Sequence, residues 1–258
     1  MTYSYGVTLL ILCPLVFLAA FIDSIAGGGG LISLPAYILA GFPIHTAGGT
    51  NKFSSSIGTL AAVINYIRSG SVDFAAAVAG GLAAIAGAWT GTRLALSLSP
   101  RVLQICLMVI LPLAGIFILT SRGMKTPVPK KPLSFRLKIL CAAAVGLVIG
   151  CYDGFFGPGA GMFMTLALAF LVRLELIKAV GTTKVLNFSS NMASMVTWLV
   201  NGKVFFPVAI PCMLCSAAGG FLGSRMAIKT GRKLIRLVLA FVAVLLFAKI
   251  LFDLVKSG

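Results

Sequence analysis

The sequence has few acidic residues and very little histidine. Its 258 residues include 5 Asp or Glu, 21 Lys or Arg and a single His. No Gly-Lys-Ser/Thr phosphate loop, no residues at metal-ligand spacing and no Ser/His/Asp set occur outside its apolar segments. We therefore expect neither an enzyme nor an ATP-driven pump, and we expect no cofactor and no bound metal.

Long polar stretches are also scarce. Hydrophobic residues make up 59% of the chain, charged residues make up 10%, and the mean hydropathy is +1.08. A membrane-crossing helix needs about 20 apolar residues, and several runs reach that length, including 74–98 and 234–252. Little sequence is left for a soluble catalytic domain. The composition predicts an all-α polytopic membrane protein.

The six cysteines do not indicate disulfides. All lie inside or at the edge of apolar segments, where cysteine behaves as a small hydrophobic residue. Cys212 and Cys215 have the spacing of a redox pair, but they lie within an apolar run, so helix packing is the better explanation.

The net charge of +16 does not indicate nucleic-acid binding. Basic nucleic-acid binders gather Lys and Arg on a solvated face with interleaved aromatic residues. Here the cations lie in short loops between apolar runs, as the positive-inside rule describes. We expect membrane lipids as partners and no nucleic acid.

The chain contains a repeat with an offset of about 132 residues. Thr50-Asn51-Lys52 returns as Thr182-Thr183-Lys184, and Gly91-Thr92-Arg93 returns as Gly223-Ser224-Arg225. Upstream, Asp23 followed by a run of glycines reappears as Asp153 followed by alternate glycines. The sequence thus divides into a first transmembrane repeat at 1–120, a basic, proline-containing linker at 121–135 and a second repeat at 136–258.

Each repeat offers five apolar segments, of which the second is short, at 29–42 and at 159–172. If all ten segments cross the membrane, about 13 cations lie on the linker side and about 5 on the other, whereas without the short segments the division is about 10 against 9. The first arrangement is favoured. An odd number of crossings per half produces two inverted repeats, with both termini outside and the linker in the cytoplasm.

The glycine clusters interrupt apolar segments and free backbone polar groups, which in lipid must face protein, water or a ligand. A helix that starts after such a break directs N–H groups and a positive dipole end toward it, which suits an anion. The alternative is that the glycines only permit tight turns. The candidate ligand-binding positions in the breaks are Gly28, Gly29, Gly30, Gly159 and Gly161.

Lys52 and Lys184 lie inside the third segment of each half. An intramembrane cation costs at least about 2.5 kcal/mol, so a functional role is the default interpretation, and the alternative is snorkelling to the interface. Neighbouring hydroxyls and amides could bind the oxygens of an anion or could instead form interhelical hydrogen bonds. These neighbours are Thr50, Asn51, Thr183, Asn187 and Asn191.

Asp23 and Asp153 each precede a break. A buried carboxylate can exchange protons and couple their movement to a substrate, but it could also cap the following helix or pair with a lysine. Arg93 and Arg225, near the ends of the fourth segments, are further candidates for substrate binding. Helix dipoles and snorkelling explain these arginines equally well or better, and His45 is interpreted as an interfacial loop residue.

At these positions the sequence resembles the TauE/SafE family, which comprises sulfite-exporter and toluene-sulfonate-uptake permeases. The resemblance rests on Asp-Ser-Ile-Ala-Gly-Gly-Gly-Gly from Asp23, Gly-Gly-Thr-Asn-Lys-Phe from Gly48, and Gly-Phe-Phe-Gly-Pro-Gly-Ala-Gly from Gly154. It covers nearly the whole chain except the linker. It implies transport of sulfite, sulfoacetate and related small organic anions across the bacterial inner membrane. The family is usually drawn with seven or eight spans, fewer than the ten segments counted here.

The sequence therefore predicts a secondary transporter of a small sulfur-containing or organic anion, working by alternating access with protons as candidate coupling ions. A passive anion channel and a non-transporting membrane scaffold or assembly factor remain as alternatives. A homodimer is compatible with the sequence, which does not set the oligomeric state.

Overall fold

The computed structural model describes residues 4–106, 109, 133–155, 157–231 and 234, and these residues form helices and loops without any strand. The predicted all-α class is confirmed. Residues 121–132 of the predicted linker, and most of the fifth segment of each half, lie outside the described residues. The helices are α1 Tyr5–Ala26, α2 Gly30–Leu39, α3 Ile44–Arg68, α4 Phe74–Ser97, α6 Phe135–Phe155, α7 Ala160–Phe170, α8 Leu176–Val200 and α9 Phe206–Thr230.

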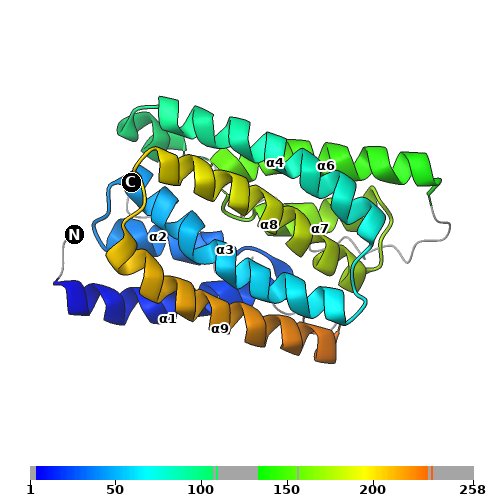
Figure 1. The fold of residues 1–258 in the computed structure, drawn as a ribbon, viewed down its shortest axis with the longest axis horizontal. Helices are drawn as coiled ribbons and strands as arrows, with labels where there is room; N and C mark the ends of the chain where they lie inside the picture. The colour runs from blue at the N-terminus through cyan, green and yellow to red at the C-terminus, as the bar shows by residue number, and fades with distance from the viewer. Residues whose placement is uncertain (1–3, 107–108, 110–132, 156, 232–233, 235–258) are drawn as a thin grey trace, which may run out of the picture.

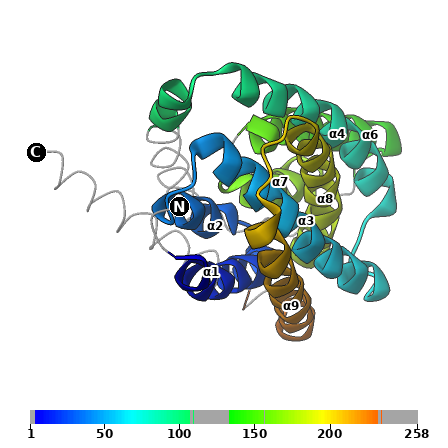
Figure 2. The same ribbon diagram turned by 60° about the vertical axis from the view of Figure 1, so that its left-hand side comes forward.

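Four of the described helices, α1, α4, α6 and α9, are long and apolar enough to cross a membrane. Helices α3 and α8 have 25 residues each, but their Lys, Asn, Ser and Thr residues lower their hydropathy. These polar residues are mostly buried, because α3 and α8 pack against each other and are flanked by α9 and α4. Figure 2 shows α3 between α8 and α9.

The second helix of each half is shorter than the apolar segment that predicts it. Helices α2 and α7 have 10 and 11 residues, a length of about 15–17 Å, which is about half of the hydrocarbon core of a bilayer. Both follow glycines with positive φ, namely Gly27 and Gly28 in the first half and Gly157 and Gly159 in the second. The breaks occur where predicted, and neither short helix crosses the full thickness as a helix by itself.

Equivalent helices of the two halves run in opposite directions (Figure 1). The starts of α1 and α9 are joined by a hydrogen bond from the Tyr5 hydroxyl to the Pro207 carbonyl, 2.9 Å. The starts of α4 and α6 are joined by a 2.8 Å ion pair between Asp73 and Lys138 at the other end of the bundle. These directions are those expected of an inverted repeat. The complete repeat includes the fifth segments and stays a prediction.

The fourth helix of each half packs mainly on helices of the other half. Helix α4 packs on α6 and α8, and α9 packs on α1 and α3, so the fourth helix of each half lies on the first and third helices of the other. Small residues allow this close approach: a Cβ on Gly146 of α6 would lie 2.0 Å from the carbonyl oxygen of Gly80 of α4. The core is therefore shared between the halves.

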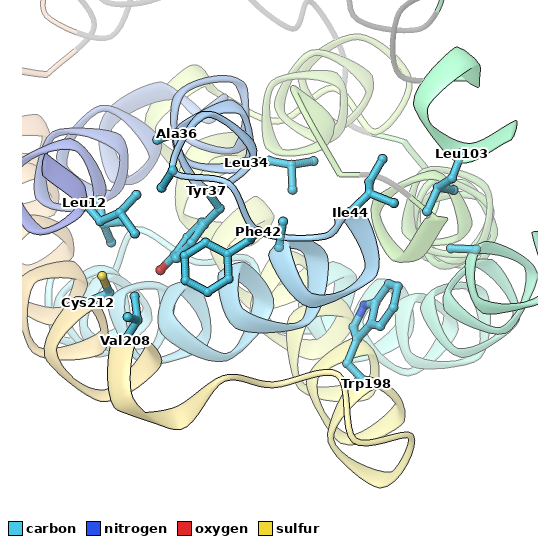
Figure 3. Close-up of a cluster of buried hydrophobic side chains, with 14 residues drawn as sticks. Leu12, Leu34, Ala36, Tyr37, Phe42, Ile44, Leu103, Trp198, Val208 and Cys212 are labelled. Carbon is cyan, nitrogen blue, oxygen red and sulfur yellow. The ribbon is translucent and has the colours of Figure 1, made fainter. Parts of the chain in front are cut away.

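The largest apolar cluster lies near the end of the bundle where α3 begins. It joins residues of α1, α2, α3, α8 and α9, including Leu12, Tyr37, Ile44, Trp198 and Val208 (Figure 3). These side chains fill the space between the short helix α2 and the ends of the neighbouring long helices. They leave the polar residues of α3 and α8 in the interior, between this cluster and a second one around Tyr66 at the other end.

Candidate functional site

Two buried ion pairs connect the halves. The Nζ atom of Lys52 in α3 lies 2.9 Å from Oδ1 of Asp153 in α6, and Nζ of Lys184 in α8 lies 2.8 Å from Oδ2 of Asp23 in α1. The lysine of each half thus pairs with the acid of the other half. Pairing with a lysine, one of the arrangements considered for the acids, is present in the structure at both positions.

The ion pairs are inside the protein and do not snorkel to an interface. Lys184 has no exposed surface and Lys52 is 6% exposed. A charge held away from water is tolerated when a counter-ion and hydrogen bonds surround it. Since both lysines lie one to two turns inside their helices and face the acids at the ends of α1 and α6, the breaks after those helices bring carboxylates to the lysines.

Asp153 is the more enclosed acid, with a side chain that is 3% exposed. Besides Lys52, its carboxylate accepts hydrogen bonds from the Ser190 hydroxyl and from Nδ2 of Asn187 at 3.4 Å. Lys52 also donates to Oδ1 of Asn191 at 2.8 Å. Asp153 and Lys52 therefore belong to one polar network built largely from α8.

Asp23 has fewer partners and more access. Its side chain is 20% exposed, and its Oδ1 accepts the backbone N–H of Gly29 at 3.0 Å while its Oδ2 accepts Lys184. Asp23 therefore accepts the backbone N–H of the residue that precedes α2 in addition to pairing with a lysine. The positive end of α2 thus lies next to a carboxylate of the protein.

The two helix breaks lie against each other. A Cβ on Gly27 would lie 2.4 Å from the backbone nitrogen of Met162, and one on Gly30 would lie 3.4 Å from Cα of Pro158. The glycines thus serve close backbone contact between the breaks, as well as the positive φ of Gly27. This contact holds the ends of α1 and α6 and the starts of α2 and α7 together.

A cavity lies beside these breaks and is partly open to the outside. Its apolar lining comes from Val16, Ala19 and Ala20 of α1, and most of its other lining residues are polar or glycine. The polar lining comprises Asp23, Ser24, Ser33, Asn51, Lys52, Ser55, Thr59, Asp153, Asn187, Asn191 and Ser216, and the glycines are Gly29, Gly30, Gly58, Gly157 and Gly161. In the part of the chain that the structure describes, no three His, Cys, Asp or Glu side chains are grouped to hold a metal ion.

Some polar atoms that line the cavity have unused hydrogen-bonding capacity. Oδ1 of Asn51 and Oγ of Ser216 are buried without a hydrogen-bond partner. A lysine ammonium has three N–H donors, and Lys52 directs two of them at Asp153 and Asn191. Buried polar groups normally have partners. The polar lining is therefore equipped to bind the polar end of a small molecule.

The structure brings most of the predicted site residues to this cavity. The predicted residues that line the cavity are Asp23, Gly29, Gly30, Asn51, Lys52, Asp153, Gly161 and Asn187. Lys184 is behind this surface, paired with the cavity-lining Asp23. Gly28 and Gly159 lie in the breaks with φ of +96° and +81°, and they shape the chain there without lining the cavity.

Four predicted site residues lie away from this cavity. The Thr50 hydroxyl accepts the backbone N–H of Phe205 at 3.1 Å, and the Thr183 hydroxyl bonds to that of Thr165 at 3.1 Å. Arg93 and Arg225 are exposed on the outside of the bundle. Their guanidinium groups lie over the rings of Trp89 and Phe221, at 4.3 Å and 4.2 Å.

Ser55 and Thr59 of α3 line the cavity but were not predicted as site residues. They correspond to Asn187 and Asn191 at the repeat offset of about 132 residues. Together with Lys52 they have the i, i+3, i+7 spacing of one helix face. Following the repeat for about two turns on the C-terminal side of each lysine identifies them.

Comparison with known proteins agrees with this architecture. The family model described as "Sulfite exporter TauE/SafE" matches residues 12–250. The chain belongs to the TauE/SafE family. Relatives of this TauE/SafE protein include a "Probable membrane transporter protein" of Haemophilus influenzae, 34% identical over 92% of both chains, and YfcA of Escherichia coli, with the same description, 33% identical over 92% of this chain and 87% of its own. A Sinorhizobium relative is 36% identical over 92% of this chain and 90% of its own.

No solved structure matches this TauE/SafE chain at a significant level. The family and its relatives identify the protein as a membrane transporter, in agreement with its apolar helices. The cavity, the helix breaks and the two ion pairs are the parts of this transporter that can be connected to a substrate.

Proposed function

We propose that this protein is a secondary transporter of small sulfur-containing or organic anions, such as sulfite, sulfoacetate or other organosulfonates, in the bacterial inner membrane. The family description supports the substrate class. The cavity supports it as well, because its lining includes a lysine, several neutral polar side chains and small apolar residues. Alternating access between the inverted halves would move the anion across the membrane.

The observation that carries the proposal furthest is the charge balance of the site. Lys52 pairs with Asp153 and Lys184 pairs with Asp23, so two positive charges are matched by two negative charges. A bound monoanion would leave one uncompensated negative charge in a largely buried site, which is costly. Uptake of one proton by an acid restores neutrality. We infer that the anion and a proton bind together.

Asp23 is the better candidate for taking up the proton. Its carboxylate is more exposed than that of Asp153, and it lines the cavity close to where an anion would bind. The charged groups around it are Lys184 on α8, Lys52 on α3 and Asp153 on α6. Protonation of Asp23 would leave Lys184 to be balanced by the bound anion, while the Lys52–Asp153 pair stays intact.

Thermal stability of the purified protein tests anion binding. A ligand that binds the native state raises its melting temperature. We expect such a rise with sulfite, thiosulfate or an organosulfonate, and a larger rise at acidic than at alkaline pH for an alkyl sulfonate, whose own charge does not change there. The Lys52→Met variant should lose the rise. Failure of all these anions to stabilise the wild type would contradict the substrate class.

Counterflow in liposomes separates a transporter from a channel. We expect labelled anion to exchange against unlabelled anion inside the vesicles, with a rate that saturates. Uptake without saturation and without exchange would indicate a passive channel. Absence of any flux, with the protein correctly inserted, would favour a structural role in the membrane.

A further inference from the structure

A second, smaller cavity adjoins the first. Both cavities are lined by Asn51 and Lys52, which therefore stand between them. The second cavity is largely apolar and extends toward the end of the bundle where α3 begins and α8 ends. Its remaining lining residues are Leu34, Ile44, Gly48, Leu103, Gly154, Phe155 and Trp198. Lys52 thus borders both cavities.

Trp198 of α8 lines the second cavity. Its side chain is 3% exposed, and in Figure 3 the indole points toward Ile44, the first residue of α3. A Cβ on Gly48 would lie 3.3 Å from Cζ2 of the indole, and the ring centroids of Trp198 and His45 are 6.0 Å apart. The absence of a side chain at Gly48 lets the ring lie directly on α3.

An equivalent aromatic contact occurs at the opposite end of the bundle. Tyr66 precedes Trp198 by the repeat offset of 132 residues, and Gly49 precedes Gly181 by the same offset. A Cβ on Gly181 would lie 3.2 Å from the Tyr66 ring, and one on Gly49 would lie 3.2 Å from Cβ of Trp198. At each end, the aromatic residue of one long helix lies on a glycine of the other.

Tyr66 is also connected to the site. It is fully buried, and its hydroxyl donates a 2.8 Å hydrogen bond to the carbonyl of Ser24, next to Asp23. Its ring belongs to an apolar cluster with Ile25, Val72 and Val180. A buried aromatic side chain therefore lies at each end of the α3–α8 pair, with the polar residues between them.

We propose that Trp198 and Tyr66 are gates at the two ends of one translocation route, and that the second cavity is the part of this route on the Trp198 side. Separation of α3 from α8 at one end would move Trp198 away from Gly48 and Gly49 while Tyr66 stays on Gly181. Separation at the other end would do the opposite. The site is then open to one side of the membrane only. The proposal rests on the transport function proposed above.

Side-specific labelling of a reporter cysteine tests the gates. Ser55, which lines the first cavity and is partly exposed, is replaced by Cys in a full-length protein whose native cysteines are changed to Ala. A membrane-impermeant thiol reagent is applied to right-side-out and inside-out vesicles. We expect Trp198→Ala to raise the labelling rate several-fold from one side, and Tyr66→Ala to raise it from the opposite side.

Two further variants serve as controls. Trp89 is an aromatic residue on the outer surface of α4, 46% exposed, so Trp89→Ala should leave labelling unchanged from both sides. Tyr66→Phe keeps the ring and loses the hydroxyl, so it should keep labelling low if the ring forms the seal. Should the Ala variants fail to insert, Trp198→Leu and Tyr66→Leu replace them, since they keep an apolar side chain without the ring.

Increased labelling from the same side in both gate variants would overturn the proposal. Labelling at the parent rate in correctly inserted gate variants would overturn it as well. The measurement needs no substrate, so it is independent of the anion assignment. Side-specific labelling together with a lack of anion exchange would support the gates and refute the proposed function. Anion exchange without side-specific labelling would refute only the gates.

Discussion

Asp23 and Asp153 occupy corresponding positions in the two halves but have different surroundings. Asp153 is enclosed by donors from Lys52, Asn187 and Ser190, whereas Asp23 reaches the cavity and has Lys184 and one backbone N–H as partners. A carboxylate with access to the cavity can exchange a proton as the anion binds. A carboxylate held by a complete network serves mainly to keep its lysine in place.

Replacement of Asp23 by Asn should make anion binding independent of pH. Asn has the shape of the protonated acid and carries no charge, so the site no longer needs a proton to accept an anion. We expect the anion-induced rise in melting temperature of Asp23→Asn to be the same at acidic and alkaline pH. A pH dependence like that of the wild type would assign the proton to another group.

Asp153→Asn is the matched variant, and its main effect should be on stability. It leaves the buried Lys52 ammonium without a carboxylate, and loss of one partner of a buried ion pair typically costs about 3–5 kcal/mol. We expect a clear drop in melting temperature without ligand. A melting temperature equal to that of the wild type would show that the network around Asp153 contributes little to the fold.

The sequence singles out these residues and offers pairing with a lysine as one role for the acids, but it does not show which acid pairs with which lysine. A charged residue in an apolar segment indicates a functional role because its burial in the membrane costs free energy. The repeat strengthens this interpretation for the lysines, since each half contains one. An offset between repeats shows which residues are equivalent and does not show which are in contact. Arg93 and Arg225 illustrate this limit, since they repeat as well as the lysines do and yet lie on the outer surface.

At the scale of elements, the helix breaks place the acids next to the lysines. Local composition predicts the breaks well, because glycine and proline interrupt helices through backbone geometry alone. The predicted short segments are longer than α2 and α7, since residues 40–42 and 171–172 continue the apolar pattern but lie outside the helices. Contact between the two breaks depends on tertiary packing and carries no local sequence signal.

Gly27→Ala tests whether this contact supports the fold. Gly27 has φ of +84°, and an added Cβ would lie 2.4 Å from the backbone nitrogen of Met162. Gly70 also has a positive φ, +68°, but a Cβ added there would have no atom within 4 Å, which makes Gly70→Ala a matched control for backbone strain. Backbone strain alone costs roughly 1–3 kcal/mol. We therefore expect Gly27→Ala to lower the melting temperature markedly more than Gly70→Ala.

Equal losses in the two variants would mean that the breaks can separate at little cost. In that case α2 would be held mainly by α1 and α3, and α7 by α6 and α8, all within their own halves. The ion pairs alone would then have to bring the acids to the lysines.

At the scale of the whole molecule, the halves depend on each other. Each fourth helix packs on the first and third helices of the other half, and each buried lysine finds its acid there. A half by itself would expose the glycine-rich faces of its helices and would leave Lys52 or Lys184 without a counter-ion inside the membrane. The division of the chain into two repeats thus describes its sequence and not two separable folding units.

Coexpression of the two halves tests this dependence. With the chain split within the predicted linker, we expect residues 1–120 and 136–258 to copurify through a tag on either half, and neither half to give a stable monodisperse protein alone. The charge-reversed pair Lys52→Asp with Asp153→Lys should copurify better than either single substitution, because each single change places two like charges in a buried site. Stable, separately folded halves would show that the shared core contributes less than the internal contacts of each repeat, and the ion pairs would then join two preformed units.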